Sequence, residues 1–165
     1  MRYYIGIDNG VTGTIAVLSE DKSLQYFVET PAIHEQSYTK KKKNIGRIYY
    51  GGLCEILEKY KDENCIAIVE RPLVNPGLFN ATLSAVRALE ATLIALESFN
   101  IEIRYIDSKE WQRELLPQGL KGSAQLKKAS LDISSRLFPI HKELINKHKD
   151  GDALLIAEYA RLKNL

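Results

Sequence analysis

The pattern of apolar and polar positions in the first part of the chain predicts strands, then a helix, then another strand. Short apolar runs rich in β-forming residues, separated by turns that contain Gly, Asn or Asp, cover residues 3–8, 14–18 and 24–29. The polar and basic stretch 31–45 predicts a long loop. Apolar residues at helical spacing predict a helix over 47–61, and a short apolar run predicts a strand over 65–69.

Helices and strands alternate in the rest of the chain. A loop with two prolines, 71–77, precedes a helix at 81–99 that is apolar around most of its circumference and is therefore expected to be a buried core helix. Alternating residues predict a strand over 101–106. Further helices are expected over 108–116, 126–138 and 152–162.

The order of these elements predicts the fold class. Three antiparallel strands followed by alternating helices and strands give an α/β fold, a mixed five-stranded sheet with parallel strands after the antiparallel ones and helices on both faces. This order fits the ribonuclease-H-like architecture. The chain has 165 residues and no evident linker, so a single domain over 1–165 is expected.

Composition narrows the setting in which the protein works. With 45% hydrophobic and 27% charged residues, the chain has the composition of a soluble globular protein. No run approaches the roughly 18 apolar residues of a membrane span, so no membrane partner is expected. Two cysteines are too few for a disulfide scaffold, and the first residues do not have the character of a signal peptide, so we expect a reducing, cytoplasmic setting.

Three acidic residues, with a fourth beside one of them, lie where fold stability alone does not require them. Asp8 ends the first apolar strand, Glu70 ends the fourth, and Asp152 opens the last helix two residues after Asp150. A charge beside a buried strand is costly unless it is paired or bound to a metal. Carboxylates gathered at strand and helix ends are ligands that Mg²⁺ accepts, and two such ions can promote phosphodiester cleavage. The four acids are therefore candidate metal ligands and catalytic residues.

Each acid also has a purely structural interpretation. Asp8 can start the Asn-Gly turn that follows it, Glu70 can pair with Arg71 at the surface, and Asp150 or Asp152 can cap the last helix. Taken one at a time, the acids do not decide between these alternatives. Their occurrence together, in this order of strands and helices, favours a metal site.

The segments that carry these acids resemble a known family. Residues 5–13 (IGIDNGVTG), 68–72 (IVERP) and 152–157 (DALLIA) resemble the acidic motifs of RuvC-like Holliday junction resolvases, and 127–130 with 137–139 is similar to the phage-type branch. The resemblance implies a metal-dependent endodeoxyribonuclease that nicks branched DNA, above all four-way junctions, leaving a 5′-phosphate and a 3′-hydroxyl. It also implies a homodimer and two Mg²⁺ ions per active site, for which Mn²⁺ can substitute.

The closing motif departs from the family pattern. The family usually has an acid or a histidine three residues before the closing aspartate, where this chain has Lys149. Asp150 is the preferred fourth ligand, because a carboxylate suits magnesium better than an imidazole does. His148 is the alternative, either as a ligand or proton carrier or as an exposed loop histidine.

Basic and aromatic residues supply candidate DNA contacts. A block without acids contains Lys40, Lys41, Lys42 and Lys43, and two further candidates are Lys121 and Lys127. Lysines neutralise backbone phosphates, although each also suits a solvated surface. Phe79 can stack on an unpaired base or be buried at the start of its helix, whereas Trp111 is expected to serve packing.

Two other functions are compatible with these residues. One is a different ribonuclease-H-like nuclease that cleaves RNA–DNA hybrids, forks or flaps. The other is a non-catalytic, structure-specific DNA-binding protein on the same fold, against which the four carboxylates argue, because acids that face phosphates weaken binding.

Overall fold

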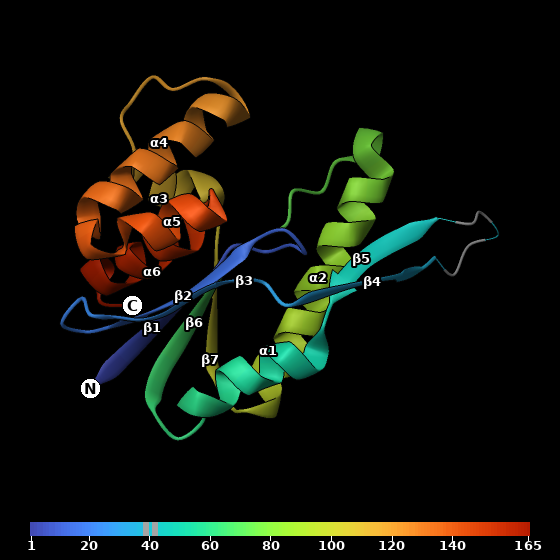
Figure 1. Cartoon of the computed structure of the whole chain (residues 1–165), viewed down its shortest axis with the longest axis horizontal. Coiled ribbons are helices and arrows are strands. Elements are labelled where there is room, and N and C mark those ends of the chain that lie inside the picture. The colour runs from blue at the N-terminus through green and yellow to red at the C-terminus, as the bar shows by residue number, and fades with distance from the viewer. Residues whose placement is uncertain (38–39, 41–42) are drawn as a thin grey trace.

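The computed structural model describes residues 1–37, 40 and 43–165. A five-stranded sheet lies at its centre in the order β3-β2-β1-β6-β7 (Figure 1). Its strands are β1 (Arg2–Ile7), β2 (Thr14–Ser19), β3 (Leu24–Glu29), β6 (Asn64–Glu70) and β7 (Glu102–Ile106). The first three pair antiparallel, and β6 and β7 continue the sheet in parallel pairing with β1 and with each other. The predicted mixed sheet is thereby confirmed.

Helices cover both faces of the sheet, as predicted (Figure 1). One face is covered by α1 (Tyr50–Leu57) and α2 (Phe79–Ser98), the other by α3 (Ser108–Leu115), α4 (Gly122–Leu137), α5 (Lys142–His148) and α6 (Asp152–Lys163). The alternation of side chains along β1 divides the core: Tyr4 packs with the α6 side, and Ile5 and Ile7 pack with the α1–α2 side. The short helix α5 was not predicted, and α4 begins earlier than predicted.

A second, two-stranded sheet replaces part of the predicted loop at 31–45. Strands β4 (Ala32–Gln36) and β5 (Asn44–Ile48) pair antiparallel and form a hairpin beside the main sheet (Figure 1). The loop prediction was wrong there, and the following helix begins at Tyr50 rather than at 47. Most hairpin residues are at least partly exposed, so no buried apolar run marked these strands in the sequence. Lys41 and Lys42 lie outside the described residues.

The helix α2 is not the buried core helix that its apolar sequence suggested. Its buried residues are Ala88, Thr92, Ala95 and Leu96, and the exposed apolar ones include Leu83, Val86 and Ile94. By length and composition, the segment Pro76–Ser98 is apolar enough to cross a membrane. The search for long apolar runs in the sequence did not single it out, because polar residues such as Arg87 and Glu90 interrupt it.

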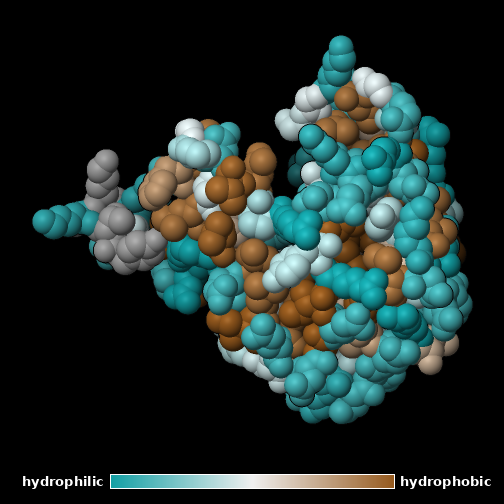
Figure 2. Space-filling view, turned by 180° about the vertical axis from the view of Figure 1, so that it is seen from behind, coloured by the Kyte–Doolittle hydropathy of each residue, from teal (hydrophilic) through white to brown (hydrophobic). Residues whose placement is uncertain are grey.

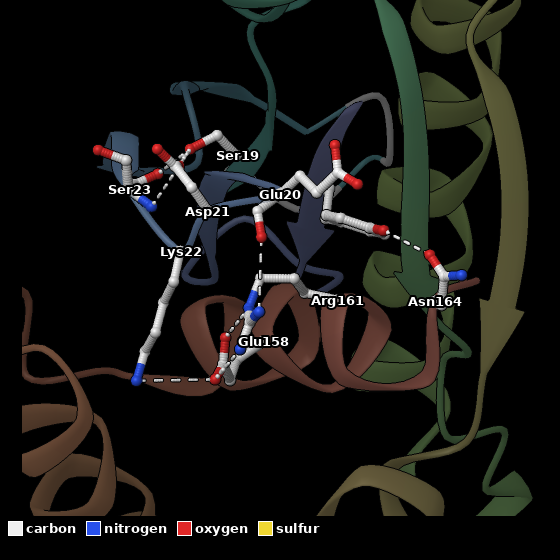
Figure 3. A network of polar contacts seen from close by, with 9 residues as sticks. Ser19, Glu20, Asp21, Lys22, Ser23, Glu158, Arg161 and Asn164 are labelled. Atoms are coloured by element: carbon white, nitrogen blue, oxygen red, sulfur yellow. Dashed lines mark hydrogen bonds and ion pairs between the residues drawn. The ribbon is translucent and has the colours of Figure 1, made fainter. Parts of the chain in front are cut away.

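The last helix, α6, lies directly on the sheet and is held at two places. A Cβ atom at Gly6 would lie 2.1 Å from the carbonyl oxygen of Ala153, so only glycine permits this close approach of α6 to β1. Farther along the helix, the buried Glu158 pairs with Arg161 at 2.8 Å and with Lys22 at 3.8 Å (Figure 3). Lys22 lies in the turn between β2 and β3, so this network ties α6 to the edge of the sheet.

Candidate metal centre

Strands β1 and β6 bring Asp8 and Glu70 to the same edge of the sheet. The two strands pair in parallel, with Gly6 opposite Ile68 and Ile7 opposite Val69. The next pair of positions in this register is Asp8 and Glu70. Side chains alternate between the faces of a strand, so both acids extend from the face that α6 covers. Sequence-distant acids thus become neighbours through strand register alone.

The start of α6 and the turn before it supply two more acids. Asp152 is the first residue of α6, and Asp150 lies in the preceding turn. The Asp150 Oδ1 atom accepts a hydrogen bond of 2.9 Å from the backbone N–H of Asp152. Gly151, not Asp150, is the N-cap residue of α6, but this bond satisfies the first free N–H group of the helix and occupies one of the two Asp150 carboxylate oxygens.

Three of the four predicted acids converge. One carboxylate oxygen from each of Asp8, Asp150 and Asp152 lies within 4.8 Å of the others, and this is the one such group of potential metal ligands among the described residues. The side chain of Asp150 is only 4% exposed. Its Oδ2 atom is buried and makes no hydrogen bond within the described part of the chain, while Lys127 Nζ lies 3.8 Å away.

The negative charges of the clustered carboxylates are not fully compensated by nearby positive groups. Burial, followed by the charges of Asp150, Asp152 and Glu70, raises the pKa of Asp8 well above its usual range. Burial and the neighbouring Asp150 also raise the pKa of Asp152, against smaller opposing effects of Ser130 and Lys127. These shifts mean that the protein alone does not stabilise the fully ionised cluster.

Glu70 lies beside this group rather than within it. Burial, together with the charge of Asp152, raises the pKa of Glu70 to about 7, although the neighbouring Trp111 lowers it. Arg71, the surface partner considered for Glu70, instead pairs with Asp107 at 3.0 Å. That structural alternative for Glu70 is therefore wrong.

A cleft opens beside Asp8 and Glu70. It has a volume of about 730 Å³ and is lined by Asp8, Glu70, the loop 71–75, the start of α2 and the start of α3. The space-filling view shows the surface hollowed between α2 and the opposite helices (Figure 2). The cleft gives an extended ligand a path to the carboxylates.

The donor atoms fit a hard divalent cation. All the converging groups are carboxylates, and one of them, Asp150, has a buried oxygen without a hydrogen bond among the described residues. Mg²⁺ and Mn²⁺ prefer oxygen ligands of this kind. A bound cation would also relieve the mutual repulsion that raises the pKa of Asp8. The cluster can therefore hold a divalent metal ion, and its donors do not distinguish Mg²⁺ from Mn²⁺.

The alternative histidine lies elsewhere. His148 Nδ1 is 3.4 Å from Oε1 of Glu29, and its ring packs edge-on against Phe27. Its Nε2 atom is buried and makes no hydrogen bond within the described ranges. His148 is not part of the converging group, and it is not the exposed loop residue considered as its structural alternative, because it ends α5.

The candidate DNA contacts lie at different distances from the cluster. Lys127 reaches it, whereas Lys121 precedes α4, and Lys40 and Lys43 lie between the two strands of the hairpin. Phe79 is 69% exposed at the start of α2, so the alternative that it is buried was wrong. The expectation for Trp111 is confirmed, because its side chain is buried in the core.

One residue of the site was missed by the sequence analysis. The hydroxyl of Ser130, on α4, donates a hydrogen bond to Oδ1 of Asp152. Ser130 follows Lys127 by three positions, a spacing that places both on one face of a helix. That spacing was visible in the sequence, but the partner across the fold was not.

Comparison with solved structures identifies the fold. The chain is similar to a structure described as T. thermophilus RuvC in complex with Holliday junction substrate, with a TM-score of 0.62 and 16% identity over 98% of this chain and 96% of that one. It is also similar to a Thermus thermophilus RuvC structure, with a TM-score of 0.53 and the same identity and coverage. No family model and no curated protein matches the sequence. The predicted RuvC-like fold is confirmed, and at this identity the likeness is one of fold.

Proposed function

We propose that the protein is a metal-dependent endonuclease that nicks branched DNA, with four-way junctions as its main substrate. The observation that carries the proposal is the convergence of Asp8, Asp150 and Asp152 at the edge of the sheet, with uncompensated charge. The similar fold of RuvC bound to a Holliday junction supports branched DNA as the partner. The cleft beside the acids provides space for a nucleic-acid strand.

In this proposal Asp8, Asp150, Asp152 and Glu70 hold two Mg²⁺ ions, with Mn²⁺ as a substitute. When bound, these ions supply positive charge for an in-line displacement at the phosphate and a water of lowered pKa. Asp8 and Glu70 line the cleft, where a DNA backbone can approach, and Asp150 and Asp152 lie against Asp8. Lys127, 3.8 Å from Asp150, is positioned to turn from the acid to a phosphate when a cation takes its place.

Contacts with DNA beyond the reacting phosphate are assigned to the basic and aromatic candidates. Lys121 and Lys127 lie on the α4 side of the molecule, and Lys40 and Lys43 lie on the hairpin. Contacts with phosphates position the DNA without reading its sequence. The exposed ring of Phe79 is available to stack on a base that is unpaired at a branch point.

The exposed apolar face of α2 supports a homodimer. Phe79, Leu83, Val86 and Ile94 are all exposed and follow one another at intervals of three, four or eight residues, so they form a stripe along the helix. Figure 2 shows hydrophobic residues, in brown, gathered over this part of the molecule. A stripe of this kind is buried when a second helix packs against it, and a dimer would present two cleavage sites to the opposed strands of a junction.

The decisive experiment compares substrates. We expect the purified protein to cleave a four-way junction in Mg²⁺ and to be inactive when the metal is chelated, with slower cleavage of a fork and little of a duplex. Cleavage of an RNA–DNA hybrid in preference to the junction would instead support the alternative nuclease. Junction binding without cleavage in either Mg²⁺ or Mn²⁺ would support the non-catalytic alternative.

A separate experiment tests the dimer. Sedimentation of the wild-type protein is expected to give a dimer, and Leu83→Glu, which places a charge in the stripe, is expected to give a monomer. A monomeric wild-type protein that binds lipid vesicles through α2 would contradict the dimer and assign the apolar face to a membrane.

A further inference from the structure

One face of α4 supports the turn that carries Asp150 and Asp152. Lys127, Ser130 and Ser134 are spaced by three and four residues, so they lie on the same side of the helix. A Cβ atom at Gly151 would lie 2.2 Å from Oγ of Ser134, so the turn packs directly against α4. The position of the two acids therefore depends on this helix.

Ser130 makes the one hydrogen bond that links α4 to an acid of the cluster among the bonds described. Its hydroxyl donates to Oδ1 of Asp152, and its side chain is almost completely buried. Hydrogen bonds to a carboxylate are stronger than those between neutral groups, and burial removes the competition from water. The contact fixes the orientation of the Asp152 carboxylate within the group that it forms with Asp8 and Asp150.

The neutrality of the donor matters for metal binding. A lysine or arginine in the place of Ser130 would orient Asp152 equally well, but its charge would oppose a bound cation. The hydroxyl orients the carboxylate and leaves the negative charge of the cluster available. The one cation within ion-pair distance of the cluster among the described residues, Lys127, is largely exposed and is free to leave.

We propose that Ser130 is a positioning residue of the metal site, whose hydroxyl holds Asp152 in the orientation that binds a divalent cation. The inference rests on the proposed function, because it assumes that the cluster binds metal. Residues that orient metal ligands typically change metal affinity by 10- to 100-fold when they are replaced. Ser130 therefore acts through Asp152 and does not touch the substrate.

The test measures Mn²⁺ affinity without DNA, from the electron paramagnetic resonance signal of the free ion. Ser130→Ala is expected to bind Mn²⁺ about tenfold more weakly than the wild-type protein. Ser134→Ala is the matched control, because Ser134 is also buried on α4, but its hydroxyl donates to the backbone oxygen of Leu131. Ser134→Ala keeps the Cβ atom that packs beside Gly151 and removes no hydrogen bond to an acid, so it is expected to lose clearly less affinity than Ser130→Ala. Urea unfolding of both variants without metal measures any general loss of stability.

The outcomes separate this inference from the proposed function. Wild-type affinity in Ser130→Ala overturns the positioning role and leaves the metal site intact. An equal loss of affinity in both serine variants also overturns it, because the effect is then one of helix packing. A wild-type protein that binds no Mn²⁺, while Asp8→Asn behaves identically, overturns the metal site itself and this inference with it.

Discussion

Acids lie both at the start of α6 and farther along it, but the surroundings of these acids differ. Glu158, in the carboxyl-terminal half of the helix, is buried, accepts hydrogen bonds from Arg161 at 2.8 and 3.0 Å and lies 3.8 Å from Lys22 (Figure 3). At the amino end, Asp150 and Asp152 meet Asp8, and Lys127 approaches only Asp150. One helix thus joins a compensated acid to a group of uncompensated ones.

This difference in compensation distinguishes Glu158, which serves the stability of the fold, from the acidic group of the candidate metal site. A buried carboxylate is tolerated when cations and hydrogen bonds compensate it, as at Glu158. The amino-terminal group lacks that compensation, and burial with mutual repulsion raises the pKa of Asp8 and Asp152. Clusters of perturbed acids beside a cleft are typical of functional sites. The contrast within one helix is therefore the strongest local argument for a cation at its amino end.

The largest expected effect is on cleavage. Asp8→Asn removes one charge from the cluster at nearly constant size and should lower the rate of junction cleavage about 100-fold or more, because a metal ligand is lost. Gel assays in excess Mg²⁺ measure the rate, and binding of the junction should persist. Glu158→Gln is the control at the compensated acid, and at a temperature where it is folded it should keep its activity. An equal loss of cleavage rate in both variants would mean that Asp8 has no special role in catalysis compared with Glu158.

The next effect concerns stability at the compensated acid. Arg161→Met leaves Glu158 buried with only Lys22 near it and should lower the free energy of unfolding by about 3 kcal/mol, as breaking a buried ion pair does. Urea titration measures the loss. Lys163→Met breaks the surface pair of Lys163 with Glu114 and should change stability little. A similar small change in Arg161→Met would mean that Glu158 needs no compensation.

The two roles of Asp150 can be separated by one substitution. Asn retains an oxygen for the hydrogen bond from the Asp152 backbone but removes the charge that would bind metal. Asp150→Asn should therefore keep its stability and need about tenfold more Mg²⁺ for half-maximal cleavage. His148→Ala is the comparison, and a larger metal requirement in that variant would assign the fourth ligand to His148 instead.

The pH dependence of the metal-free protein follows from Glu70. Its pKa rises from an ordinary 4.5 to about 7, so the folded state binds this proton more tightly than the unfolded state does. Protonated Glu70 therefore favours the folded state. This contribution to the free energy of unfolding is fully present below about pH 4.5 and is lost as the pH rises through about 7. Without metal, the melting temperature should fall from about pH 5 to about pH 8, and Glu70→Gln should flatten this slope. Stability that rises over the same interval would contradict the uncompensated charge.

The smallest effect is expected for Lys127. Its ion pair with Asp150 is long and largely exposed, so Lys127→Ala should change the melting temperature little. If Lys127 contacts a phosphate, the slope of log affinity against log salt should fall by about 1 for every DNA substrate. An unchanged salt slope would confine Lys127 to its contact with the acid.

The central strands of the main sheet were predictable because they are buried. Strand β2, for example, is buried along its whole length, and its middle four residues, 15–18, are all apolar. The hairpin β4–β5 and the exposure of α2 were not predictable in the same way. The hairpin has no buried run, and α2 is apolar on a face that the described chain leaves uncovered. Hydropathy reports what a residue prefers to contact, and it does not report whether this chain supplies the contact.

For the site, the sequence alone determined which acids end strands and which open the last helix, because those positions follow from local periodicity. Strand register then brought Asp8 and Glu70 together. Only the tertiary structure decided that Asp150 joins Asp8 and Asp152, that His148 turns toward Glu29, and that Ser130 holds Asp152. These contacts join residues far apart in the chain across a distance of a few ångströms. They depend on the close packing of α6 on Gly6 and of α4 on Gly151, which no local pattern specifies.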